Sequence, residues 1–411
     1  MNVLHTSDWH LGASLYGRKR YDEFDSFLNW LLQKIKETKT DLLIVSGDIF
    51  DKSVPSNRAQ ELYYRFLVKV AAQGCRHVVI VAGNHDSPTF LDAPRGLLGA
   101  LNVYVIGSAK ENPADEVLTL LDSKGKVESI ICAVPYLRDR DLRKVEAGES
   151  SQDKEEKLIE GICHHYQVVC DKALKIQTEL DTSVPILATG HLFTTGAKTV
   201  EGDGVRELYV GSLARVTGGA FPKCIDYLAL GHLHVPQKVG EDRSMRYSGS
   251  PYPIGFGEAK QEKIVISVQF MDGETIIKSI SVPRFQELEQ ISGDWDSIYQ
   301  RIAQLKNELS DAWLEIIYNG EEMIPDLADR LDACLSDSQM ELLRVKNKRV
   351  IEQIMNRSHN CETLDDLEVS DVFERCLESH ELPEHQRQQL IDVFNEAVLL
   401  VQQDHSTGDE L

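Results

Sequence analysis

The sequence predicts an α/β fold on three observations. Five short apolar runs, rich in β-branched residues, each end at a small residue followed by Asp, Asn or His, which is typical of buried strands that stop abruptly. Helical spacing over 22–37 and 58–73 separates the first three runs, and strands that alternate with helices indicate an α/β domain. The chain is 42% hydrophobic and 27% charged, as expected of a globular protein with a sizeable core.

The five apolar runs occupy the first two thirds of the chain. They lie at 3–10 (VLHTSDWH), 42–48 (LLIVSGD), 78–86 (VVIVAGNHD), 186–191 (ILATGH) and 227–234 (YLALGHLH). In open α/β sheets, ligands bind beyond the carboxyl ends of the strands. We therefore expect the polar residues at these five ends to converge at one place, although they lie far apart in sequence.

The segment 138–180 is charged and has helical spacing, which predicts a peripheral helix packed on the domain. His164 and His165 lie in this segment with no carboxylate or third histidine at ligand spacing nearby. This pattern favours surface or core histidines over metal ligands.

The pattern of elements changes after about Ser281. The spacing predicts a small α/β domain whose elements are a helix at 295–309, a strand at 313–318, a helix at 323–334 and a strand at 341–345. From Cys361 onward, 14 acidic and 2 basic residues accompany helical spacing, which predicts two helices joined near Pro383. This acidic pair is either a solvated edge of the fold or a dock for a partner. The predicted domains are 1–280, 281–355 and 361–411.

Two further features bear on localisation. No stretch approaches the roughly 18 apolar residues of a membrane-spanning helix, and no basic, apolar signal sequence precedes Val3. The eight cysteines are scattered without a CxxC pair, which favours reduced thiols over a zinc site. We therefore expect a cytoplasmic protein.

The polar residues at the strand ends form a candidate metal-binding set, with Asp8, His10, Asp48, Asn84, His191, His232 and His234 as its members. Carboxylate, amide and imidazole ligands without thiolates suit Mn²⁺, Fe or Zn²⁺. The set is larger than a single ion needs, so it predicts two ions. Two ions about 3.5–4 Å apart need a bridging ligand, and a carboxylate can bridge through its two oxygens. We predict that Asp48 is the bridge.

The glycines ahead of Asp48, Asn84, His191 and His232 are predicted to allow a tight turn that brings the next side chain to the ions. His85 and Asp51 are predicted to form a catalytic dyad, because the ligand set is complete without them and a carboxylate can orient a protonated imidazole. Each motif alone is common by chance. Five motifs together favour a metal site.

The blocks D-x-H, G-D-x-x-D, G-N-H-D, G-H and G-H-x-H occur in this order, beginning at Asp8, Gly47, Gly83, Gly190 and Gly231. In these blocks the chain resembles the calcineurin-like metallophosphoesterase superfamily. Within it, residues 5–12 (HTSDWHLG), 247–251 (YSGSP) and 343–345 (LRV) resemble the nuclease subunits of bacterial DNA-end-processing complexes. The likeness spans nearly the whole chain.

The resemblance implies a two-sheet sandwich flanked by helices, a capping domain over a DNA groove, and a C-terminal helix pair that docks on a coiled-coil ATPase. It also implies 3'-5' exonuclease and hairpin endonuclease action in DNA recombination, replication and repair, and a homodimer within a heterotetramer.

For the site, the resemblance implies two Mn²⁺ ions, one held by Asp8, His10, Asp48 and His234 and the other by Asp48, Asn84, His191 and His232. His85 then faces the scissile phosphate. Asp51 departs from the archaeal and eukaryotic relatives, which have histidine there, so the tuning of His85 is expected to differ.

The net charge of −22 argues against long-range attraction to nucleic acid, because phosphate contacts need clustered Lys and Arg. Two bound cations, a partner ATPase and the basic residues Arg344, Lys346, Lys348 and Arg349 are expected to offset this charge. Two alternatives stay open at this point. A phosphatase or nucleotide phosphodiesterase would have the same metal centre, whereas a non-catalytic scaffold is disfavoured because no ligand is missing.

Overall fold

The computed structural model describes residues 1–142, 150–194, 219, 221–240, 244–271, 273–322, 324, 326–347 and 394. The chain divides into two compact units, Met1–Leu288 and Glu289–Leu411. The helix pair predicted for 361–411 lies outside the described residues, Phe394 excepted. The three-domain division therefore stays a prediction.

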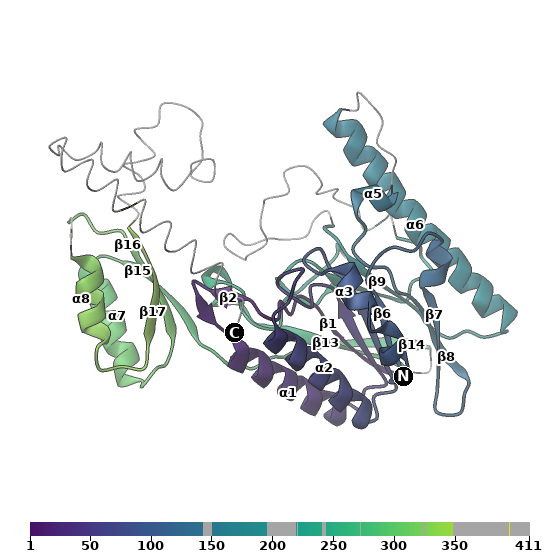
Figure 1. Ribbon diagram of the computed structural model, residues 1–411, viewed down its shortest axis with the longest axis horizontal. Coiled ribbons are helices and arrows are strands. Elements are labelled where there is room, and N and C mark those ends of the chain that lie inside the picture. Colours follow the sequence, from purple (N-terminus) through teal and green to yellow (C-terminus); the bar gives the residue numbers. More distant parts are fainter. Residues whose placement is uncertain are drawn as a thin grey trace. The chain divides into compact units, whose positions relative to one another are not determined.

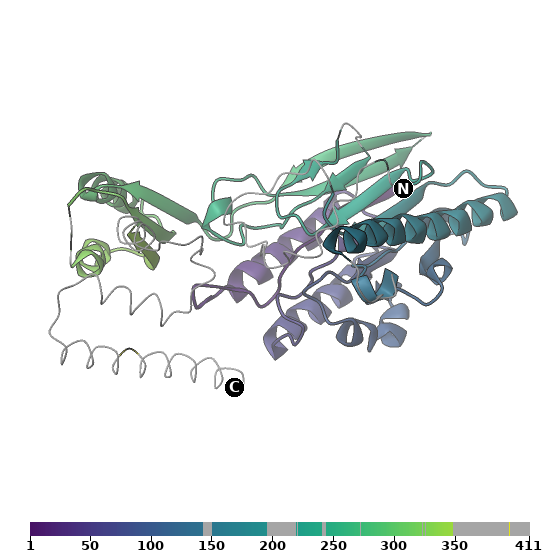
Figure 2. The ribbon, with the colours of Figure 1, turned by 90° about the horizontal axis from the view of Figure 1, so that it is seen from above.

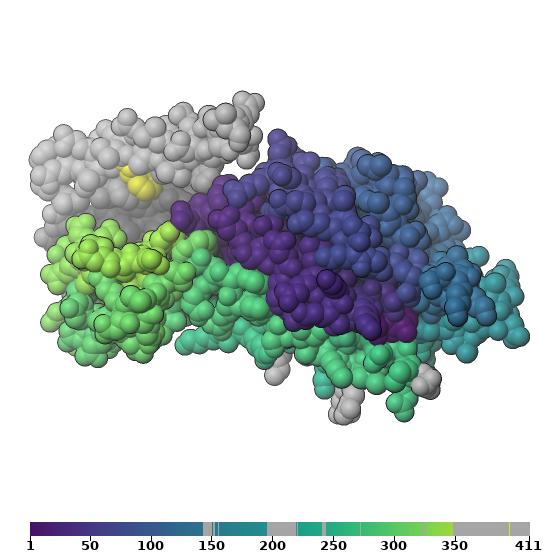
Figure 3. Space-filling model, turned by 90° about the horizontal axis from the view of Figure 1, so that it is seen from below, coloured from purple at the N-terminus to yellow at the C-terminus, as the bar shows by residue number. Residues whose placement is uncertain are grey.

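The first sheet of unit 1 has the strand order β14-β13-β1-β4-β5-β6. Its strands are β1 (Asn2–Thr6), β4 (Leu42–Ser46), β5 (His77–Val81), β6 (Val103–Ile106), β13 (Ile264–Met271) and β14 (Glu274–Ser281). The strands β1, β4, β5 and β6 run parallel, and the β13–β14 hairpin pairs antiparallel with β1. Residues distant in sequence are therefore neighbours, and Figure 3 shows the purple N-terminal residues beside green residues of this region.

Two helices, α1 (Tyr21–Glu37) and α2 (Asn57–Ala72), lie side by side against this sheet (Figure 1). Phe27 of α1 and Phe66 of α2 pack in one core with Leu43 and Val45 of β4. The helix α2 begins after Ser56, whose hydroxyl accepts a hydrogen bond from the Ala59 backbone N–H, the usual way to satisfy a free donor at a helix start.

The second sheet has the strand order β11-β12-β10-β9-β8-β7. Its strands are β7 (Val117–Leu121), β8 (Val127–Cys132), β9 (Ile186–His191), β10 (Tyr227–Gly231), β11 (Gln237–Lys238) and β12 (Met245–Tyr247). The long helix α6 (Ser151–Glu179), which is prominent in Figure 2, packs on this sheet through residues such as Ile162 and Val169.

Helix α6 confirms the predicted peripheral helix, and one of its two histidines is a core residue. His165 is buried, and its Nε2 lies 2.7 Å from Oε2 of Glu116, which is fully buried. His164 is exposed. Neither histidine belongs to a candidate metal cluster among the described residues.

A third core lies between the two sheets. Ile44 and Val79 of the first sheet pack there with Leu187 and Ala229 of the second. The central strands β4, β5 and β10 are buried along their whole length, which explains why they appear in the sequence as continuous apolar runs. The layers are helix, sheet, sheet and helix, so the predicted two-sheet sandwich is confirmed.

The remaining short elements of unit 1 are β2 (Ser14–Leu15), β3 (Arg18–Lys19), α3 (Pro88–Asp92), α4 (Arg95–Gly99), η1 (Pro113–Glu116), α5 (Asp139–Leu142) and η3 (Phe256–Glu258). Every cysteine within the described part of the chain is free. None of the helices among the described residues has the length and apolar character needed to cross a bilayer.

Unit 2 contains a three-stranded sheet of order β15-β16-β17, formed by β15 (Leu288–Gly293), β16 (Trp313–Tyr318) and β17 (Glu341–Asn347). The helices α7 (Trp295–Asn307) and α8 (Leu327–Leu335) contribute Ile298 and Leu331 to one core with Leu314. The helix α8 begins later than the predicted 323. The strand β15 was not predicted, because its residues LEQISG lack a sustained apolar alternation.

Candidate metal centre

The predicted site residues converge although they follow strands of two different sheets. Asp8 and His10 follow β1, Asp48 follows β4, and Asn84 follows β5, all in the first sheet. His191 ends β9, and His232 and His234 follow β10, in the second sheet. The carboxyl ends of these strands meet where the two sheets face each other, since Asp48 and His191 come within 3.3 Å.

The backbone turns sharply at several of these positions. Four of the site residues have a positive φ angle, which residues other than glycine adopt at an energetic cost. The values are 53° for Asp8, 43° for His10, 50° for Asp48 and 98° for His232. Hydrogen bonds from the Asp8 N–H to the Gly47 carbonyl and from the His10 N–H to the Asp48 carbonyl, both 3.0 Å, hold two of the turns together. Strain of this kind clusters at functional sites.

Two glycines leave room for the ligands themselves. A Cβ atom added at Gly47 would collide with the imidazole of His191, and one added at Gly83 would collide with the carboxylate and backbone of Asp48. The glycines were predicted to allow tight strand exits. In the structure Gly47 has a positive φ of 89°, whereas Gly83 does not. Both glycines allow close approach of a neighbouring ligand side chain.

One group of ligand atoms comes from Asp8, His10 and His234, all buried, whose ligand atoms lie within 4.8 Å of one another. The Nε2 atoms of His10 and His234 are 3.2 Å apart. A carboxylate oxygen of Asp8 accepts a hydrogen bond from the His232 backbone N–H at 2.9 Å. These contacts leave two imidazole nitrogens facing each other.

A second group comes from Asp8, Asp48 and His191. The side-chain oxygen of Asn84 lies 3.0 Å from Nε2 of His191 and 3.0 Å from Nδ1 of His232. Oδ2 of Asp48 is 3.3 Å from Nε2 of His191 and 3.7 Å from Nε2 of His10. Asp48, a member of the second group, therefore also lies near His10 of the first group, as a bridging ligand would, and Asp8 belongs to both groups.

The protonation states of His191 and Asp48 indicate that these ligand atoms need a proton or a cation between them. Nδ1 of His191 donates to the Ser46 carbonyl at 2.9 Å, so Nε2 of the neutral ring presents a lone pair to the Asp48 and Asn84 oxygens. Although burial opposes a charged ring, Asp48 raises the pKa of His191 to about 9. Burial alone would raise the pKa of Asp48, but His191 and His10 hold it well below its usual range. A proton, or a cation in its place, is needed where these lone pairs meet.

The same logic applies to the other group. Nδ1 of His234 donates to Glu258 at 3.2 Å, so its Nε2 faces Nε2 of His10 as an acceptor. Burial opposes the charged form of His234, yet Glu258 raises its pKa to about 9. Nδ1 of His10 is buried and has no hydrogen-bond partner in the described part of the chain. The residues present therefore fit two divalent cations.

His85 and Asp51 lie beside the first group, but the contact between them differs from the expected one. Nδ1 of His85 donates to the main-chain carbonyl of Asp51 at 2.9 Å. The Asp51 carboxylate instead lies 3.6 Å from Nδ1 of His10. Residues 51 and 85 are both partly exposed, and the rings of His10 and His85 meet edge to face at 4.9 Å. The imidazole of His85 is thus oriented by backbone, which leaves its Nε2 for other contacts.

Several residues that support the site had no predicted role. The buried Asp86 carboxylate accepts hydrogen bonds from the backbone N–H groups of Ile49, Phe50 and Gly83 at 2.9–3.1 Å. It thereby ties the loop after β4 to the loop after β5. Its place in the G-N-H-D block was a usable clue.

Glu258 and Lys263 were missed as well. Both side chains are buried, and Glu258 contacts His234 although it lies 24 positions further along the chain. The segment around them carries no recognisable metal or catalytic spacing. No feature of the sequence alone would have selected these two residues.

A two-sheet sandwich that carries this ligand set at its strand ends defines a metal-dependent phosphoesterase, and the comparisons agree. The family model described as "Calcineurin-like phosphoesterase" matches residues 1–236, and the model described as "Type 5 capsule protein repressor C-terminal domain" matches residues 284–381. The chain is 36% identical over 397 residues to the SbcD subunit of the nuclease SbcCD from Escherichia coli (strain K12), covering 96% of this chain and 97% of that protein.

The corresponding SbcCD nuclease subunits from Bacillus subtilis (strain 168) and Rhodobacter capsulatus are 33% and 32% identical, over 67% and 63% of this chain and 67% and 64% of theirs. This chain therefore belongs to the calcineurin-like phosphoesterases and, within them, to the SbcD family of nuclease subunits. The resemblance seen in the sequence is confirmed.

Proposed function

We propose that this chain is the nuclease subunit of a DNA-end-processing complex with an SbcC-type coiled-coil ATPase, and that it hydrolyses DNA phosphodiester bonds at a two-metal centre. The position of Asp48 carries the proposal. Its Oδ2 lies within 3.3 Å of one histidine and 3.7 Å of another, from separate ligand groups. One carboxylate placed between two donor groups is what two closely spaced ions require.

The proposed ligands of the first ion are Asp8, His10, Asp48 and His234, and those of the second are Asp48, Asn84, His191 and His232. We take both ions to be Mn²⁺, which accepts mixed carboxylate, amide and imidazole ligands. When bound, such a pair neutralises charge on the phosphoryl oxygens and makes a water molecule more acidic.

His85 is the proposed catalytic residue, with Asp51 as its orienting partner. The hydrogen bond from Nδ1 to the Asp51 carbonyl fixes the ring, and Nε2 is then available to hydrogen-bond a phosphate oxygen or to protonate the leaving oxygen. The Asp51 carboxylate lies beside Nδ1 of His10. We therefore propose that it also orients His10, which is a metal ligand.

The ATPase partner and the ions are proposed to supply the attraction to DNA that the net charge of −22 does not. Two of the basic residues expected at a DNA groove are already paired within unit 2. Arg344 and Lys346 lie 3.5 Å and 3.1 Å from Oε1 of Glu315, which is buried. Lys348 and Arg349 lie outside the described residues.

The finer assignments of the proposal follow from family membership. They are a capping domain at 281–355, a helix pair at 361–411 that docks on the ATPase, and a homodimer of this chain within a heterotetramer. We further propose 3'-5' exonuclease and hairpin endonuclease activity in recombination, replication and repair, and a cytoplasmic location.

The test is Mn²⁺-dependent cleavage of hairpin-ended and linear duplex DNA by the purified chain, with and without the ATPase and ATP. We expect cleavage that is lost in His85→Gln. If the wild-type chain leaves both DNA substrates intact under all conditions but hydrolyses small phosphomonoesters, the nuclease proposal is wrong and a phosphatase takes its place.

A further inference from the structure

We propose that Glu258 and Lys263 form a positioning pair that holds His234 in the orientation needed to bind the first of the two ions. This inference rests on the proposed function, because it requires His234 to be a metal ligand. It adds two residues to the site that have no ligand spacing in the sequence.

The imidazole ring of His234 is oriented by a buried carboxylate. Nδ1 of His234 donates a hydrogen bond to Oε1 of Glu258 at 3.2 Å, and Glu258 is fully buried. A carboxylate can only accept, so this contact keeps the proton on Nδ1 and leaves Nε2 as a lone pair. That lone pair points to the ligand group, because Nε2 lies 3.2 Å from Nε2 of His10.

The carboxylate of Glu258 is itself held in place. Oε2 of Glu258 accepts hydrogen bonds from the Ser250 hydroxyl at 3.2 Å, from the Ile254 backbone N–H at 3.1 Å, and from the ammonium group of Lys263. A buried carboxylate without a counter-charge would be costly. Lys263, which is 4% exposed, supplies that charge, so the carboxylate has no reason to turn toward the ions.

The main chain of His234 is held in place as well. The Lys263 ammonium also donates to the His234 carbonyl at 3.1 Å, and the Ser250 backbone N–H donates to the same oxygen at 3.2 Å. The pair therefore holds His234 at two points, the ring through Glu258 and the backbone through Lys263.

This arrangement is asymmetric between the two ions. Among ligands of the second ion, Nδ1 of His191 donates to a neutral backbone carbonyl, that of Ser46, at 2.9 Å. A charged acceptor makes a stronger hydrogen bond and a more basic imidazole than a neutral one. Loss of the Glu258–Lys263 pair should therefore weaken binding of the first ion, which His234 holds, and leave binding of the second ion unchanged.

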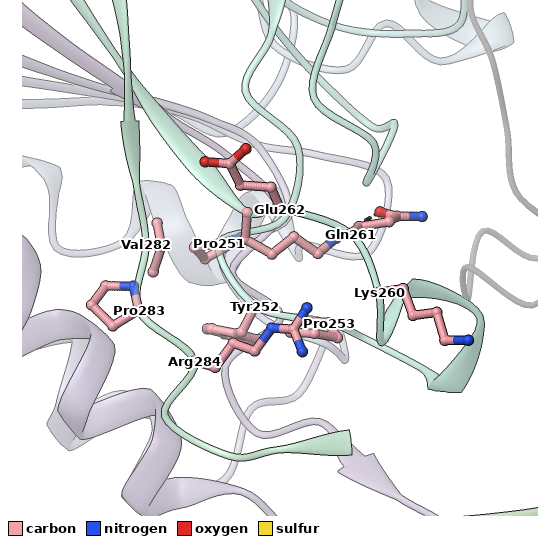
Figure 4. Close-up of a pocket in the computed structure, with 10 residues that line it drawn as sticks. Pro251, Tyr252, Pro253, Lys260, Gln261, Glu262, Val282, Pro283 and Arg284 are labelled. Atoms are coloured by element: carbon pink, nitrogen blue, oxygen red, sulfur yellow. Dashed lines mark hydrogen bonds between the residues drawn. The ribbon is translucent and has the colours of Figure 1, made fainter. Parts of the chain in front are cut away.

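Lys263 also lines a pocket of about 180 Å³ between the loop Pro251–Pro253 and the residues Val282–Arg284 (Figure 4). None of the proposed metal ligands lines this pocket. Arg284, which also lines this pocket, is paired with Glu287 at 2.7 Å. Substituting Arg284 thus changes the pocket that Lys263 lines without removing a hydrogen bond to His234.

The experiment is a calorimetric titration of the full chain with Mn²⁺, comparing the wild type with Glu258→Gln. We expect two ions in the wild type, and in the variant one ion bound about 10- to 100-fold more weakly, the usual effect of losing a group that orients a ligand. The matched control is Glu116→Gln, which changes a fully buried carboxylate that contacts the buried His165 at 2.7 Å. Both Glu116→Gln and Arg284→Ala should bind both ions as the wild type does.

A second variant separates positioning from general destabilisation. Glu258→Gln leaves Lys263 buried without its counter-charge, whereas Glu258→Gln combined with Lys263→Met removes both charges and should recover the free energy of unfolding. The inference is supported if the double variant recovers the free energy of unfolding but still binds one of the two ions more weakly than the wild type. Recovered stability with both ions bound normally overturns it, as does unchanged binding in Glu258→Gln. A wild-type chain that binds no Mn²⁺ would refute the proposed function itself.

Discussion

The Oδ2 atom of Asp48, at the end of β4 in one sheet, lies 3.3 Å from Nε2 of His191, at the end of β9 in the other. Both side chains are buried. This contact joins the two sheets at their carboxyl ends, and the strand-end motifs gather around it.

Asp48→Asn should reduce the number of bound divalent ions as well as the rate of cleavage. The amide keeps the size of the carboxylate but has a single oxygen and no charge, so it cannot bridge two cations. Metal content measured by plasma mass spectrometry after dialysis checks this. The control is Asp41→Asn, which alters the partly exposed ion pair with Arg76. A variant that retains both ions would exclude Asp48 as the bridge.

His85→Gln should lower DNA cleavage about 10²- to 10⁴-fold, the usual contribution of a group that transfers a proton, and leave metal content unchanged. His85 is expected to act on the substrate, because its Nδ1 is already taken by the Asp51 carbonyl. Single-turnover rates and metal content should be measured on the same sample. Loss of an ion together with activity would reassign His85 as a ligand.

Gly83→Ala should destabilise the fold by about 1–3 kcal/mol, the typical cost of overpacking, and should weaken metal binding. The added methyl group would collide with the Asp48 carboxylate. The matched control is Gly96→Ala in α4, where nothing lies within 4 Å of the added atom. Urea unfolding of both variants gives the comparison. Equal free energies of unfolding for the two would show that the loop after β4 can move aside.

The stability of the metal-free chain should fall between pH 6.5 and about 9. The pKa values of His191 and His234 are both raised to about 9, above the ordinary value of about 6.5. Their stabilising contribution is complete below pH 6.5 and is lost as the pH rises through the folded-state value. The measurement is the thermal unfolding temperature across this pH range, with and without saturating Mn²⁺. The metal-loaded chain should not lose stability there, because binding requires deprotonated nitrogens.

Deletion of residues 361–411 should abolish co-purification with the ATPase and leave metal-dependent hydrolysis of small phosphodiesters intact. All proposed metal ligands lie in Met1–Leu288, so the chemistry does not need the deleted segment. Affinity purification from cells that express both chains gives the answer. Undiminished co-purification would place the docking surface elsewhere.

Much of unit 1 was predictable from the sequence because its information is local. The strands β4, β5 and β10 are buried on both faces and appear as continuous apolar runs, and each ends where a polar residue follows. The β7–β8 and β13–β14 hairpins and β15 were not predicted. Strands such as β14 have no fully buried residue, so their sequences lack the continuous apolar run that identifies a buried strand.

The sequence by itself determined which residue types stand at the strand ends, and with them the class of chemistry, because strand endings and ligand types are properties of short segments. Only the tertiary structure decided which atoms meet. It distributed the five strands over two sheets, placed Asp48 between the two ligand groups, and turned the Asp51 carbonyl toward His85. It also brought Glu258 and Lys263 behind His234. Contacts of this kind depend on how separate segments pack, and no spacing within one segment encodes them.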